Sequence, residues 1–101
     1  MAIVEVTVVP LGTAEPGLSK YVAGCQEILE QEEKIEYQLT PMGTIIEGDL
    51  ELIFALIKKM HHHPFEQGAL RVTTSIKIDE RRDKKASMKQ KLGSVHDKLE
   101  S

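Results

Sequence analysis

Polar side chains alternate along three segments of this sequence that have the pattern of β-strands. Their acid, hydroxyl, amide and basic groups recur at every second position: Glu5, Thr7, Gln38, Thr40, Arg71, Thr73, Ser75 and Lys77. Because alternate residues of a strand share one face, these groups can gather on one side of a sheet and surround a small polar ligand. Antiparallel sheets also commonly expose a polar face to water, so the pattern alone favours a solvated face unless an oligomer covers it.

The segment 41–48 places a glycine turn, the Thr44 hydroxyl and the Glu47 carboxylate close together. A carboxylate near backbone amides can orient an aminated heterocycle or neutralise a ligand cation. Thr44 and Glu47 have opposite parity, so in a regular strand they point to opposite faces. A hairpin turn followed by helix-entry residues explains the same segment without a ligand, and both interpretations stay open.

Three consecutive histidines, His61 to His63, suggest a metal site. Consecutive helical positions point about 100° apart, however, and neither a His-x-x-x-His nor a Glu-x-x-His pair accompanies them. A solvated helix end explains the run better, although His61 lies where a buried hydrogen bond could form. We therefore expect no metal site.

Basic residues near the end of the last predicted strand could bind a phosphate. The acids Asp79, Glu80 and Asp83 lie between these basic residues and favour ion pairs with them instead.

The remaining sequence favours binding over catalysis. The single cysteine, Cys25, falls on an apolar helical stripe, where a buried thiol is the ordinary interpretation. No G-x-S-x-G, P-loop, G-x-G-x-x-G or paired-carboxylate signature occurs in the sequence. We therefore expect no enzyme activity and no cofactor.

Hydrophobic periodicity predicts the strands and helices that carry the polar side chains described above. Strands are predicted over 1–9, 35–40, 44–47 and 69–79, and helices over 18–32, 49–64 and, at the C-terminus, around 88–99. Pro10 is expected to end the first strand, and Pro64 the second helix, which Asp49 should cap. The order predicts an α+β, ferredoxin-like split βαβ sandwich, with a four-stranded antiparallel sheet, helices on one face and an added C-terminal helix.

Length and charge narrow the functional classes. The 101 residues are expected to form a single domain over 1–101, and a net charge of −3 argues against non-specific nucleic-acid binding. No apolar run approaches the roughly twenty residues that a membrane span needs, and no signal-peptide pattern occurs, so we expect a cytoplasmic protein. A domain of this size buries only about two-thirds of its unfolded surface, which makes a homo-oligomer plausible.

Several short motifs occur together over nearly the whole chain. They are Pro10-Leu-Gly-Thr13, Ser19-Lys-Tyr-Val-Ala23, Tyr37, Pro41-Met-Gly-Thr-Ile-Ile-Glu-Gly48, His61, Gly68, and Arg71-Val-Thr-Thr-Ser-Ile-Lys-Ile-Asp79 with Arg82 and Asp83. In this order and spacing the sequence resembles the small thiamine-binding protein family, which is related to the YkoF domains. The resemblance implies a ferredoxin-like protomer that forms a homotetramer, a dimer of dimers with sheet faces packed together. It also implies binding of thiamine or its hydroxymethylpyrimidine portion without a reaction.

The resemblance further implies a ligand site on the polar sheet face, buried by the oligomer. The residues expected to bind the ligand are Glu5 and Glu47 as carboxylates, Thr7, Thr40, Thr44 and Thr73 as hydroxyls, Arg71, and Gly43. None of the four aromatic residues is placed on that face by the pattern to stack a ring. A different class of function stays open, namely a structural or regulatory oligomeric domain of the same fold that senses another small metabolite.

Overall fold

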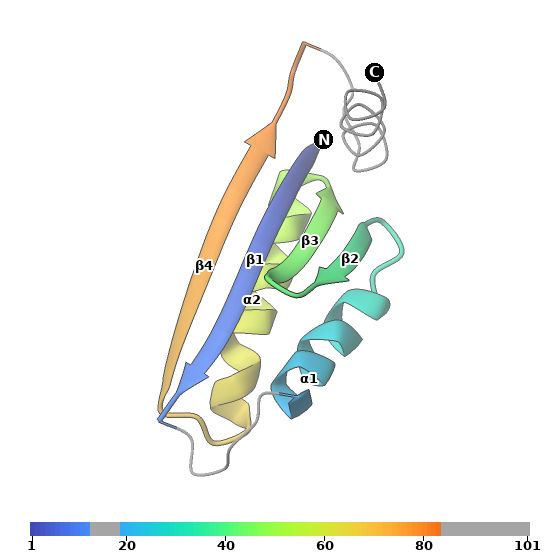
Figure 1. Cartoon of the computed structure of the whole chain (residues 1–101). Coiled ribbons are helices and arrows are strands. Elements are labelled where there is room, and N and C mark those ends of the chain that lie inside the picture. The colour runs from blue at the N-terminus through green and yellow to red at the C-terminus, as the bar shows by residue number, and fades with distance from the viewer. Residues whose placement is uncertain (13–18, 84–101) are drawn as a thin grey trace.

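Four strands and two helices alternate along the chain in the computed structural model, which describes residues 1–12 and 19–83 (Figure 1). They are β1 (Ala2–Leu11), α1 (Ser19–Glu30), β2 (Glu36–Thr40), β3 (Gly43–Gly48), α2 (Leu50–Glu66) and β4 (Arg71–Glu80). The strands form one antiparallel sheet in the order β2-β3-β1-β4, and both helices cover the same face (Figure 1). The predicted α+β, ferredoxin-like fold is thus confirmed, whereas the predicted C-terminal helix lies outside the described residues.

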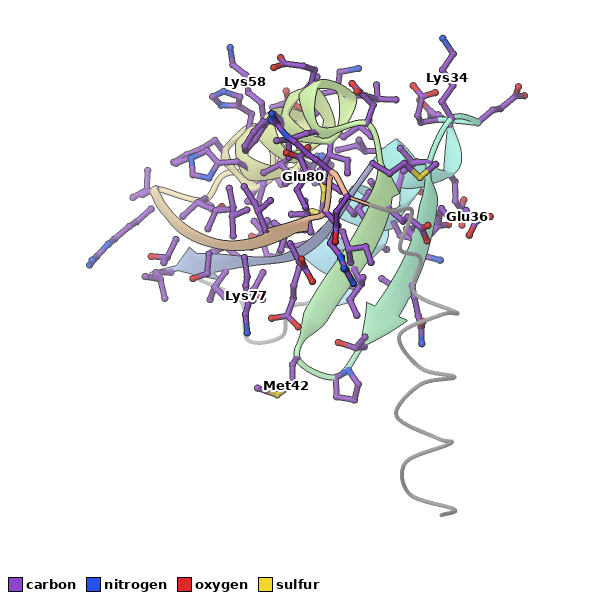
Figure 2. All side chains as sticks on the ribbon, turned by 90° about the horizontal axis from the view of Figure 1, so that it is seen from above. Lys34, Glu36, Met42, Lys58, Lys77 and Glu80 are labelled. Carbon is purple, nitrogen blue, oxygen red and sulfur yellow. The ribbon has the colours of Figure 1, made fainter. Side chains whose placement is uncertain are left out.

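The strand register assigns each side chain to one of two sheet faces. Val4 lies opposite Ile46 on one side and Ile78 on the other, and this row faces the helices. Glu5 lies opposite Lys77, and this row belongs to the other face, which we call the open face. Figure 2 shows the two sides directly, because Lys77 points away from the helices while Lys58 of α2 points away from the sheet. The register therefore gathers the alternating polar groups on the open face, as the sequence predicts.

The hydrophobic core lies between the helix-covered face and the two helices. Its largest fully buried side chains come from both layers: Val4, Val6 and Ile46 of the sheet, with Leu29, Ile53, Met60 and Pro64 of the helices. Burying each of the larger side chains contributes roughly 1.5–3 kcal/mol, which fixes α1 and α2 on the sheet. The Asp49 side chain caps α2 by accepting a hydrogen bond from the Leu52 amide at 3.2 Å, as predicted.

Two prolines do not end the elements that they were predicted to end. Strand β1 continues through Pro10, because β3 pairs with β1 only as far as Val6 and leaves that side of the strand without a partner. Helix α2 continues through Pro64 to Glu66. The proline lacks the amide that would bond the Met60 carbonyl, and the Cys25 thiol of α1 donates to that carbonyl instead, at 3.7 Å.

Candidate functional site

A cavity of about 240 Å³ opens between α1 and the turn that joins β2 to β3. We call it the α1–hairpin cavity. Its apolar walls include Val6 and Val8 of β1, Leu39 of β2 and Met60 of α2. None of the described residues that line it carries a charge. Typical ligand pockets are about 300–1,000 Å³, so this cavity is sized for a single small ring and suits a neutral one.

Hydrogen bonds from two strands hold the hairpin turn at the mouth of the cavity. The Thr40 hydroxyl donates to the Gly43 carbonyl at 2.8 Å and accepts from the Met42 amide at 3.2 Å. From β1, the Thr7 hydroxyl donates to the Met42 carbonyl at 2.9 Å. Met42 itself lies at the exposed tip of the hairpin (Figure 2). The turn is therefore positioned before any ligand binds, which lowers the entropy cost of binding.

Gly43 permits a close approach between the hairpin and β1. Its φ of +150° lies in the region that L-residues rarely adopt. A Cβ atom at this position would lie 2.6 Å from the Thr7 Oγ1 and 2.8 Å from the Val6 carbonyl oxygen. Glycine is thus required here both by backbone conformation and by lack of space.

The Thr44 hydroxyl is the polar group in the α1–hairpin cavity that remains available to a ligand. Thr44 lies opposite Val6 in the register, so its side chain is on the helix-covered face. The hydroxyls of Thr7 and Thr40 already bond the turn, whereas that of Thr44 has no hydrogen-bond partner among the described residues. Every fully buried polar side-chain atom of the described residues has a hydrogen-bond partner. The Thr44 oxygen has none, so it is not fully buried and is accessible from the cavity that Thr44 lines.

Helix α1 contributes a ring and a thiol to the same cavity. Tyr21 and Cys25 are four residues apart, lie on one helical stripe and are both buried. Burial raises the pKa of the Cys25 thiol above its ordinary value of 9.0, so the sulfur stays protonated near neutral pH and is a poor nucleophile. The sequence interpretation of a buried structural thiol is confirmed. The sequence prediction missed Tyr21 as a site residue because it expected a stacking ring only on the open face, whereas Tyr21 reaches the cavity from α1.

The eight residues predicted to bind a ligand fall into two groups. Thr7, Thr40, Gly43 and Thr44 line the α1–hairpin cavity. Glu5, Glu47, Arg71 and Thr73 lie on the open face and do not line it. Within this second group Glu47 is only 8% exposed, while Glu5, Arg71 and Thr73 are exposed. Thr44 and Glu47 point to opposite faces, as their parity predicts, so they cannot contact one ring together.

One histidine of the run, His61, makes a hydrogen bond. The His61 Nδ1 and the Thr74 Oγ1 are 2.6 Å apart in a partly buried bond that ties α2 to β4, as the sequence suggested for His61. In the described ranges 1–12 and 19–83, no three His, Cys, Asp or Glu side chains converge to hold a metal ion. Within those ranges, too, no helix is long and apolar enough to cross a membrane.

The arginines after β4 make the ion pairs that the interleaved acids predict. Arg81 bonds Asp83 at 2.6 Å, and Arg82 bonds Glu80 at 3.2 Å. The hydrogen bond to Asp83 raises the pKa of Arg81, which stays protonated throughout. These two arginines are therefore occupied, and they offer little to a phosphate.

A family profile described as thiamine-binding protein matches residues 4–96, almost the whole chain. The chain belongs to the thiamine-binding protein family. It is 52% identical over 103 residues to the UPF0045 protein YqgV of Bacillus subtilis, covering 99% of both chains. A crystal structure of protein MJ1052 from Methanocaldococcus jannaschii matches with a TM-score of 0.83 and 34% identity, over 94% of this chain and 95% of that one.

A more distant structure extends the family fold. A Thermotoga maritima protein, described as a proposed thiamine biosynthesis or salvage protein, has a TM-score of 0.76 at 22% identity, over 93% of this chain and 97% of that one. At this identity the similarity shows that the two proteins share the fold. A thiamine-related role for the present chain follows from the family to which it belongs.

Proposed function

We propose that this protein binds thiamine, without a chemical reaction, by inserting the hydroxymethylpyrimidine ring into the α1–hairpin cavity. The observation that carries the proposal is the accessible Thr44 hydroxyl in a cavity whose described walls carry no charge. Membership of the thiamine-binding family supports the choice of ligand. The same cavity would accept free hydroxymethylpyrimidine, and we propose that binding takes place in the cytoplasm.

The neutral walls favour the pyrimidine half of thiamine over the thiazolium half. A cation buried without a partner is costly, and the described residues around the cavity provide no carboxylate to offset it. An aminopyrimidine ring instead needs apolar contact on its faces and a hydrogen-bonding group at its edge. Leu39 and Met60 would supply the contact, and the Thr44 hydroxyl the edge. The thiazolium would then project toward the solvent at the hairpin.

We also propose a homotetramer, a dimer of dimers, in which the open face and the β4 edge are covered by other copies of the chain. No helix in the described part of the protein covers the open face, and β4 is an edge strand of ten residues without proline. Ile76 and Ile78 of β4 remain 43% and 44% exposed. A long exposed edge with apolar side chains is a template for pairing with another chain. Such an assembly would bury Glu5 and Thr73 without involving them in the cavity.

Isothermal titration calorimetry with separate ligands tests the ligand proposal. Thiamine and hydroxymethylpyrimidine should both bind, thiamine phosphates should bind similarly, and the hydroxyethyl-thiazole half should give no measurable heat. Replacing Thr44 with valine, which keeps the shape of the side chain, should weaken thiamine binding about tenfold, because one hydrogen bond to the ligand is lost. The matched substitution Thr73→Val on the open face should leave binding unchanged.

Two results would contradict this assignment. One is the absence of heat with both thiamine and hydroxymethylpyrimidine at near-millimolar concentrations, which would favour a domain that senses another metabolite. The other is an equal loss of affinity in Thr44→Val and Thr73→Val, which would move the site to the open face. The tetramer is tested separately by light scattering, in which a monomer at micromolar concentration would exclude it.

A further inference from the structure

A second concave surface lies on the outer side of the helix layer, between α1 and α2. It is an open groove with a volume of about 450 Å³, and we call it the basic groove. Its lining consists of Ile28 from α1 and Lys58, Lys59, His62, His63 and Glu66 from α2. Figure 2 shows Lys58 projecting away from the sheet, on the side opposite Lys77. The groove shares no lining residue with the α1–hairpin cavity.

One imidazole of the basic groove is seated directly against the backbone of α1. A Cβ atom at Gly24 would lie 1.9 Å from the His63 Nε2, with the other ring carbons next to it at 2.5 and 2.7 Å. Any larger residue at position 24 would therefore push the ring out of the seam between the helices. This contact fixes the position of the His63 ring, whose Nε2 faces the α1 backbone, so the ring forms a fixed part of the groove wall.

The lysines and histidines of the groove are not engaged in hydrogen bonds or ion pairs within the described part of the chain. Lys58 and Lys59 are adjacent on α2 and place two positive charges beside the two imidazoles of the groove. The helix dipole favours cations only in the last turn, whereas Lys58 and Lys59 lie about two turns before α2 ends at Glu66.

We propose that the basic groove binds the phosphate group of a small phosphorylated molecule. Such a group would offset the charges of the adjacent Lys58 and Lys59 and form charge-assisted hydrogen bonds with them. The ligand must be compact, because Glu66 borders the groove and the chain carries a net charge of −3. A long polyanion such as RNA would meet that negative charge beyond the groove. The site is independent of the thiamine proposal, since its residues do not line the α1–hairpin cavity.

Isothermal titration calorimetry of the full chain with inorganic pyrophosphate tests the proposal. Lys59→Gln should weaken binding about tenfold, and Lys58→Gln/Lys59→Gln should abolish measurable heat, because each substitution removes one charged hydrogen-bond donor. Lys34→Gln is the matched control, because Lys34 is also exposed and loses the same charge far from the groove (Figure 2). Its affinity for pyrophosphate should equal that of the unmodified protein.

Gly24→Ala adds a test that changes no charge. It should weaken pyrophosphate binding several-fold by displacing the His63 ring; if this variant does not fold, the exposed lysine variants still decide the outcome. The proposal is overturned if pyrophosphate gives no heat with the unmodified protein, or if Lys34→Gln and Lys59→Gln lose affinity equally. Thiamine binding should persist in Lys58→Gln/Lys59→Gln, so a failure of thiamine to bind anywhere would contradict only the proposed function.

Discussion

Around the hairpin turn, polar groups from neighbouring elements are bonded to one another and surround a cavity. Thr40 and Thr7 bond the turn, and Cys25 bonds the carbonyl that Pro64 leaves without a helical partner. On the rest of the open face, the polar groups lie in rows along the strands, and Glu5, Arg71 and Thr73 are exposed. The residue types are similar in the two regions, yet the groups of the second region do not line the α1–hairpin cavity.

The difference shows that hydroxyl groups become a site only when a concave surface and fixed neighbours accompany them. A flat polar face leaves its groups bonded to water, and a ligand there must replace those bonds without gaining enclosure. The open face would acquire enclosure from a second copy of the chain. We therefore expect substitutions near the hairpin to act on thiamine binding and substitutions on the open face to act on assembly.

The largest expected effect comes from Gly43→Ala. The added methyl group would collide with the Thr7 hydroxyl and the Val6 carbonyl, and the backbone would keep an unfavourable φ, so we expect a loss of about 3 kcal/mol in the free energy of unfolding. Gly68→Ala is the control, because its φ is +100° but no atom lies within 4 Å of the added carbon. It should cost only about 1 kcal/mol. Urea denaturation measures both, and equal losses would show that contact with β1 is unimportant.

Thr40→Val should have the next largest effect. It removes the two hydrogen bonds that the hydroxyl makes within the turn, so we expect stability to fall by about 1–2 kcal/mol and thiamine affinity to fall several-fold. Thr74→Val is the matched substitution, because it removes the bond to His61 far from the cavity. It should reduce stability similarly and leave thiamine affinity intact. If both variants lose thiamine affinity equally, bracing of the hairpin does not determine binding.

A smaller effect is expected from the protonation of Cys25. Because burial raises its pKa in the native state, the native protein keeps this proton at pH values where the unfolded thiol has lost it. The stability due to this group is complete below the ordinary thiol pKa and decreases as the pH rises from about 9 toward the raised native value. Urea unfolding at pH 8 and pH 10 should show this decrease in stability. The Cys25→Ala variant should lack the part of the decrease that is due to the thiol. Identical pH dependence in the two proteins would contradict the burial of the thiol.

The smallest effect on ligand binding is expected from Arg71→Ala. Arg71 is exposed on the open face and lies outside the α1–hairpin cavity, so thiamine affinity should change by less than twofold. If the open face is an interface, the same substitution should shift the assembly toward smaller species in sedimentation velocity. Weaker thiamine binding with unchanged assembly would reverse the assignment of the two faces.

Much of the fold was predictable because its signals are local. Alternation placed Glu5 and Lys77 on one face, and the Asp49 cap marked the start of α2. The two prolines misled the prediction, because their tolerance depends on where a neighbouring strand stops and on a thiol from another helix. Those features involve residues far apart in the sequence.

The candidate site was only half predictable for the same reason. Parity separated Thr44 from Glu47 correctly, and the hairpin glycine was recognised. The cavity itself depends on the distance between α1 and the hairpin turn, which no sequence pattern encodes. Tyr21 and Cys25 therefore read as ordinary core residues, although they line the cavity as well.

The central claim is that thiamine binds in the α1–hairpin cavity. Its most direct test is to titrate the ¹⁵N-labelled protein with thiamine and to record the amide chemical shifts by NMR. We predict that the largest changes occur at Tyr21, Met42 and Thr44, around the α1–hairpin cavity, while the amides of Arg71 and Thr73 change little. Changes concentrated on β4 and the open face, with the hairpin and α1 unaffected, would contradict the account.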